Sequence, residues 1–102
     1  MTPETVPADF EYTMGCAEAD LLRSLPLALP HAVIAVDALA GTVRAEFSDG
    51  SLALTWRRLP DRRIALLTIP RLHVRFAYSG LTPARRYEVQ RRFDLATQRG
   101  GG

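Results

Sequence analysis

The sequence contains no lysine, one cysteine and two histidines, and its longest apolar runs are only a few residues long. Because Cys16 has no partner cysteine, an internal disulfide is excluded and a cytoplasmic protein is expected. Cys16, His31 and His73 lie far apart in the chain, whereas zinc sites usually show closely spaced ligand pairs. We therefore expect no metal and no cofactor. A membrane-spanning helix needs about 20 mostly apolar residues, so no membrane partner is expected either.

The length of 102 residues predicts one domain, and the content of 47% apolar and 24% charged residues is ordinary for a folded chain. The polar start, residues 1–8, and the glycine-rich end, residues 99–102, are expected to be flexible. Residues 9–98 then form a single α+β domain.

Charge is divided unevenly along the chain, although the net charge is only +2. Residues 1–50 hold two arginines and eight acidic residues, while residues 51–102 hold eleven arginines and three acidic residues. Arginine as the only cationic side chain at neutral pH is consistent with a GC-rich bacterial genome. The asymmetry indicates either pairing of the two halves within the chain, which we favour, or a basic face for an anionic partner.

The clearest local pattern is a β-hairpin in TVRAEFSDGSLALTW, residues 42–56. Asp49-Gly50 between two alternating runs favours a two-residue turn in which both residues have positive φ. Pairing Ser48 with Ser51 puts all large apolar side chains on one face. They are Val43, Ala45, Phe47, Leu52, Leu54 and Trp56.

Two more strands are expected to complete a four-stranded meander over residues 42–79. Pro60-Asp61 predicts a five-residue loop, residues 58–62. IALLTI, residues 64–69, is apolar on both faces and predicts an interior strand that ends at Pro70. The following run alternates, with Leu72, Val74, Phe76 and Tyr78 facing inward and Arg71, His73 and Arg75 facing outward.

The rest of the chain predicts two strands and two helices. FEYTM, residues 10–14, alternates like a strand, and HAVIAVDA, residues 31–38, resembles a buried strand. Between them a short helix is expected to stop at Leu25, because proline disfavours helix in the residue before it. A long helix should begin after an N-cap at Thr82 and end near Gln98. Its apolar side chains form two groups, the first containing Val89, Phe93 and Ala96 and the second Ala84, Tyr87 and Leu95.

Together these elements predict an α+β fold. An antiparallel sheet of five or six strands, with its central meander at residues 42–79, is covered on one face by the short N-terminal helix and the long C-terminal helix. In architecture alone, this two-layer arrangement resembles the helix-grip fold of small-ligand binders.

The leading functional hypothesis is a binding domain with no recognisable catalytic motif. Aromatic side chains on the inner sheet face and on the last helix are candidates for binding an apolar ligand or a protein partner beneath that helix, with a homodimer as a further option. They are Tyr12, Phe47, Trp56, Phe76, Tyr78 and Phe93. The five sheet residues of this set, together with Phe10 and Met14, would equally suit a plain core, and that simpler interpretation is favoured.

The alternative is anion or nucleic-acid binding through the arginine-rich half. Its candidate residues are Arg71, His73, Arg75, Arg85, Arg92 and Arg99, the last helix carrying three of them at seven-residue intervals. An enzyme is not favoured. Cys16 at a helix start is the one candidate nucleophile, and we interpret it as a packed thiol instead.

Overall fold

The structure, a computed structural model, describes residues 6–101, with side chains as far as Thr97. The ends expected to be flexible therefore lie partly outside the described residues. The elements are β1 (Asp9–Met14), α1 (Glu18–Ala28), β2 (Val33–Asp37), β3 (Thr42–Phe47), β4 (Gly50–Ile64), β5 (Leu67–Ser79) and α2 (Pro83–Gly101).

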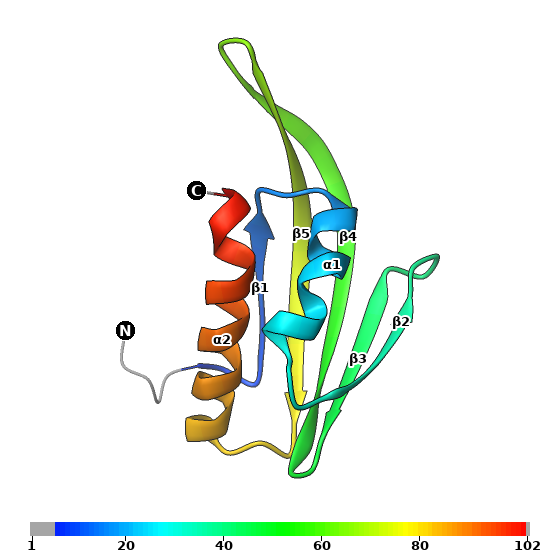
Figure 1. The fold of residues 1–102 in the computed structure, drawn as a ribbon, viewed down its shortest axis with the longest axis vertical. Helices are drawn as coiled ribbons and strands as arrows, with labels where there is room; N and C mark the ends of the chain where they lie inside the picture. The colour runs from blue at the N-terminus through cyan, green and yellow to red at the C-terminus, as the bar shows by residue number, and fades with distance from the viewer. Residues whose placement is uncertain (1–5, 102) are drawn as a thin grey trace.

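The predicted two-layer α+β fold is confirmed. The five strands form one antiparallel sheet in the order β1-β5-β4-β3-β2. Both helices lie side by side on the same face of that sheet (Figure 1). The first strand pairs with the last one, so the segment that begins α2 leaves the sheet next to β1. None of the described helices is both long and apolar enough to cross a membrane.

The core lies between the sheet and the two helices. The inner faces of β3, β4 and β5 are buried as predicted, and α1 contributes Leu21 and Leu25 to the same cluster. From α2, Val89 and Phe93 are buried, and Ala96 packs against the cluster. The second predicted apolar group of α2 is more accessible, because Ala84 and Leu95 are exposed and Tyr87 is half-buried. Thr82 caps the helix as expected, since its Oγ1 accepts the Arg85 backbone N–H at 3.2 Å.

The β3–β4 hairpin has the predicted faces but a different register. Phe47 pairs with Gly50, so Ser48 and Asp49 form the turn, and none of these residues has a positive φ. The type of turn predicted around Asp49-Gly50 is therefore wrong. The two registers differ by two residues, and a two-residue shift returns every side chain to the same face.

The predicted loop at residues 58–62 and the interior strand at residues 64–69 are also wrong. β4 continues through Pro60 with an irregularity between Leu59 and Arg62, and the chain reverses only at residues 65–66, which makes three meander strands rather than four. Pro70 lies within β5. Beyond the ends of β1 and β3, residues 57–71 form a two-stranded ribbon, here called the β4–β5 arm, which projects from the body of the molecule (Figure 1).

Two N-terminal expectations are corrected as well. α1 continues past Leu25 to Ala28 with Pro26 inside it. Leu25, Ala28 and Leu29 are all buried, so packing on the sheet offsets the local cost of proline. The predicted buried strand is the exposed edge strand β2, where Val33 is 76% exposed, because no further strand covers that edge among the described residues.

Candidate ligand-binding groove

A groove of about 710 Å³ lies between the C-terminal end of α1 and the outward side of α2. Its walls are formed by residues 27–31, by Phe47 at the end of β3 and by side chains of α2. The α2 residues are Arg85, Tyr87, Glu88, Val89, Arg91, Arg92, Leu95 and Ala96. Leu27 is 65% exposed and Leu95 is 59% exposed, so each helix presents one large apolar side chain to this space. Exposed leucines gathered in a concave surface are typical of a binding site.

The local sequence explains the position of the groove. Pro30 follows the buried Leu29 and directs the chain away from α1 toward β2. On α2, the half-buried Tyr87, the exposed Arg91 and the exposed Leu95 are spaced by four residues and therefore share one side of the helix. The groove thus has an apolar floor and a cationic rim.

One arginine of the rim is fixed by acidic neighbours. Arg85 Nε donates to Asp49 Oδ2 at 2.8 Å, and its Nη1 lies 3.4 Å from Glu88 Oε1. The Arg85 guanidinium carbon also lies 5.7 Å from the centre of the Phe47 ring. The hydrogen bond between Arg85 and Asp49 lowers the pKa of Asp49 below its ordinary value and raises the pKa of Arg85. Arg85 therefore lines the groove, but its charge is already paired with Asp49 and Glu88.

Two other arginines of the rim are available to bind an anion. Arg91 and Arg92 are exposed, and neither forms an ion pair within the described part of the chain. The groove can therefore bind an apolar body through its leucines and aromatic rings and an anionic group through two guanidinium groups.

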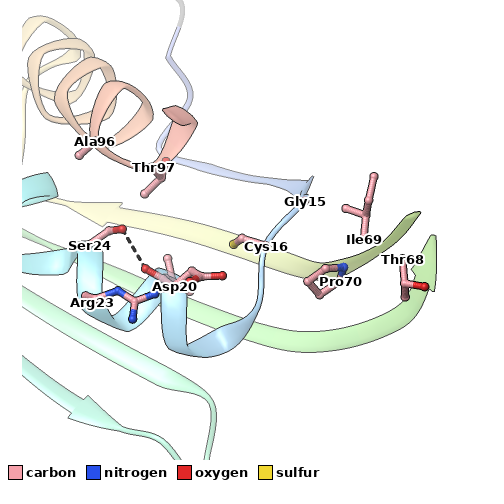
Figure 2. A pocket seen from close by; sticks show the side chains of 11 residues that line it. Gly15, Cys16, Asp20, Arg23, Ser24, Thr68, Ile69, Pro70, Ala96 and Thr97 are labelled. Atoms are coloured by element: carbon pink, nitrogen blue, oxygen red, sulfur yellow. Dashed lines mark hydrogen bonds and ion pairs between the residues drawn. The ribbon is translucent and has the colours of Figure 1, made fainter. Parts of the chain in front are cut away.

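A second cavity of about 390 Å³ lies beside Cys16 (Figure 2). Burial, and then the nearby Asp20 carboxylate, raise the pKa of the Cys16 thiol. A nucleophilic cysteine needs the opposite shift. Among residues 6–97, no group of three or more His, Cys, Asp or Glu side chains is placed to hold a metal ion. The raised pKa gives no support to Cys16 as a nucleophile.

The six aromatic residues proposed for ligand binding have different surroundings. Phe76 and Phe93 are fully buried, with their rings edge to face and their centres 5.1 Å apart. Trp56 is buried and donates from Nε1 to Glu18 Oε2 at 2.6 Å. Of the six, only Phe47 lines the groove.

Tyr12 and Tyr78 belong to a polar network that joins the sheet to α2. Tyr78 OH donates to Gln90 Oε1 at 2.7 Å, and Tyr12 OH donates to Asp94 Oδ1 at 2.9 Å. Gln90 Nε2 also donates to Asp94 Oδ1, at 2.9 Å. Burial first, and then the Asp94 carboxylate, raise the pKa of both tyrosines. The network satisfies their hydroxyl groups without a ligand.

Alkaline pH should destabilise the protein through these two tyrosines. The folded state keeps protons that the unfolded chain releases near pH 10, the ordinary pKa of tyrosine. The stabilisation from the two tyrosines is therefore fully present below that pH. As the pH rises toward the folded-state pKa values, the free energy of unfolding falls by about 1.4 kcal/mol per pH unit for each tyrosine. Urea unfolding from about pH 9 to about pH 11 measures the slope. Tyr12→Phe should reduce the slope, and an unchanged slope would contradict a contribution from Tyr12.

The basic residues proposed for anion binding are only partly free. On the open sheet face, Arg75 Nη2 lies 2.6 Å from Asp9 Oδ2, and His73 Nε2 lies 2.7 Å from Glu11 Oε1. Arg71 Nε donates to the Pro60 carbonyl at 2.9 Å. Arg92 is exposed, Arg85 is paired as described above, and the side chain of Arg99 lies outside the described residues. Nucleic-acid binding through Arg85, Arg92 and Arg99, which recur at seven-residue intervals, stays a prediction.

Internal pairing of the acidic and basic halves is confirmed by the ion pairs Asp9–Arg75 and Asp49–Arg85. Of the acidic residues that the structure describes, only Asp61 has neither an ion pair nor a hydrogen bond through its carboxylate. Among the described residues, exposed arginines without an ion pair lie in two places. These are the rim of the groove, with Arg91 and Arg92, and the β4–β5 arm, with Arg57, Arg58, Arg62 and Arg63.

Sequence reasoning missed most of the groove. The second apolar side of α2, with Tyr87 and Leu95, was the one signal for it. Leu27 lies beyond the predicted helix end at Leu25, so its position on α1 was not expected. The chain matches no protein-family model, and comparison with curated proteins finds no significant match.

Proposed function

We propose that this protein is a binding domain for an amphipathic ligand that has an apolar body and an anionic group, and that the ligand lies in the groove between α1 and α2. One observation carries this proposal. The exposed side chains of Leu27 and Leu95 share a groove with Arg91 and Arg92, two arginines without acidic partners in the described chain.

The size of the groove suits such a ligand. Small-molecule sites commonly have volumes of about 300–1,000 Å³ and combine apolar walls with a few polar groups, and this groove has about 710 Å³. The space directly beneath α2 is occupied by packed side chains such as Phe76 and Phe93, which supports placing the ligand outside α2 rather than below it.

A protein partner, including a second copy of the chain, is the other occupant that the groove can take. An amphipathic helix would use the same apolar walls. A second copy would double the molecular mass and a small ligand would not, so the oligomeric state separates these two occupants. A concentration-dependent dimer that Leu95→Glu dissociates would replace the small-ligand proposal.

The proposal can be tested with 8-anilinonaphthalene-1-sulfonate, which has an apolar ring system and a sulfonate. Its fluorescence should rise on titration with the native protein, and dodecanoate should displace it. Leu95→Glu should weaken binding tenfold or more, because a buried leucine contributes about 1.5–3 kcal/mol. Leu39→Glu is the matched control, since Leu39 is 102% exposed and lies outside the groove.

The charge requirement is tested separately. Arg91→Gln/Arg92→Gln should weaken binding of the sulfonate probe about tenfold, and Arg62→Gln/Arg63→Gln in the arm should leave it unchanged. Equal binding by the Leu95 and Leu39 variants, or no binding by the native protein, would overturn the proposed function.

A further inference from the structure

The tip of the β4–β5 arm exposes large apolar side chains at one end of the molecule. Leu66 is 101% exposed, Leu67 is 64% exposed and Ile64 is 45% exposed. They lie where the ribbon reverses, far from the helices that cover the rest of the sheet (Figure 1). Within the described chain, no other element packs over this tip.

Arginines surround the ribbon behind this tip. Arg57 and Arg58 are adjacent in β4, as are Arg62 and Arg63, and adjacent strand residues project to opposite faces. Each pair therefore places one guanidinium on each face of the ribbon. All four are exposed, and none forms an ion pair within residues 6–97.

We propose that the β4–β5 arm binds the surface of an anionic phospholipid bilayer end-on, with the tip leucines inserted among the lipids and the arginines at the level of the phosphates. Arg63 and Arg62 lie one and two strand positions before Ile64, the last residue of β4, a distance of roughly 3–7 Å at a rise of about 3.3 Å per residue. Their long side chains can bridge back toward the tip, and apolar groups of interfacial segments reach about 5–10 Å into the lipid boundary.

The number of exposed apolar side chains at the tip favours a bilayer over a nucleic acid. A ribbon that binds DNA can wedge an apolar side chain between base steps, but Ile64, Leu66 and Leu67 are exposed together at one end, which suits the broad apolar interior of a bilayer better. A ribbon that enters a lipid surface end-on is surrounded by phosphates, so arginines on both faces find partners. The proposal is independent of the groove between α1 and α2, and no membrane-spanning segment is required.

Co-sedimentation of the full chain with phospholipid vesicles tests the proposal. Vesicles with about one third phosphatidylserine should bind the protein at low salt, and vesicles of phosphatidylcholine alone should bind it much more weakly. Leu66→Glu/Leu67→Glu should reduce binding tenfold or more, while Leu39→Glu should not. Arg62→Gln/Arg63→Gln should reduce it roughly 25-fold, at about fivefold for each charge, while Arg91→Gln/Arg92→Gln should not.

Because all these side chains are exposed, the variants should keep the native circular dichroism spectrum, which confirms that the fold is intact. Absence of vesicle binding, or equal binding by the tip variant and the Leu39 variant, would overturn the proposal. Binding to generic duplex DNA that depends on Arg62 and Arg63 but not on Leu66 and Leu67 would assign the arm to nucleic acid. Self-association abolished by the tip variant would assign it to a second copy.

Discussion

Replacing Gly50 with alanine should destabilise the protein by about 3 kcal/mol, the upper part of the usual range for overpacked sites. For a domain of this size the melting temperature should fall by on the order of 15 °C. A Cβ at this position would lie well inside contact distance of the Ser79 carbonyl oxygen and 2.9 Å from the Leu81 backbone nitrogen. Both are backbone atoms, so a change of side-chain rotamer cannot relieve the clash.

The site is where two turns of the chain cross. Gly50 is the first residue of β4 and lies against the segment that follows β5. Gly80, in that segment, has a φ of +84° and lies close to the Asp49 carbonyl. Adding Cβ to Gly50 would therefore push apart the start of β4 and the connection to α2. Urea or thermal unfolding followed by far-UV circular dichroism measures the loss.

Gly15→Ala is the matched control for this substitution. A Cβ on Gly15 would meet only Ile69 Cγ2, at an ordinary 3.8 Å, so its stability should change by no more than about 0.5 kcal/mol. Equal stability of Gly50→Ala and Gly15→Ala would contradict the close contact between the two turns. It would also contradict the β3–β4 register, which places Gly50 at that contact.

The same glycine shows how far the sequence could predict this fold. Alternation of apolar residues assigned the correct side chains to the inner sheet face in residues 43–56 and 72–78, because successive strand residues point to opposite faces. Turn length is set by tertiary contacts that alternation does not report. Asp49-Gly50 favoured a turn for its local flexibility, whereas Gly50 is needed for contact with a segment about 30 residues later.

The β4–β5 arm could not be predicted for a related reason. An apolar run such as residues 64–69 is typical of an interior strand when flanking strands are long enough to cover it. Here β1 pairs with β5 only as far as Leu72, and β3 pairs with β4 only as far as Thr55. The apolar run therefore extends past the sheet and is exposed.

The groove required information from two helices at once. Leu27 lines the groove because α1 continues through Pro26. The helix continues because Leu25 and Ala28 are buried by packing on the sheet. Charge was more predictable, since the acidic first half does pair with the basic second half. Which arginines remain unpaired depends on where the tertiary fold places the acidic residues. Arg75 was a candidate although Asp9 on the neighbouring strand pairs with it, whereas Arg91 on α2 was not a candidate.

Phe93→Ala should cost about 3–5 kcal/mol of stability, the usual range for a buried phenylalanine in a core. Phe93 is fully buried, and its ring packs edge to face against Phe76 at right angles. Truncation removes this aromatic contact and leaves a cavity between α2 and the middle of the sheet. Leu95→Ala, two residues further along the same helix, should change stability by no more than about 0.5 kcal/mol because Leu95 is 59% exposed.

The same two variants should have the opposite order of effect on binding. At low temperature, where Phe93→Ala is still folded, it should keep the affinity of the native protein for the sulfonate probe, since Phe93 does not line the groove. Leu95→Ala should lose part of that affinity while keeping its stability. A Phe93→Ala variant that stayed stable and lost binding would place the ligand beneath α2, among the aromatic residues that the sequence first suggested. The pair of measurements therefore decides between a filled core with an external groove and a pocket inside the fold.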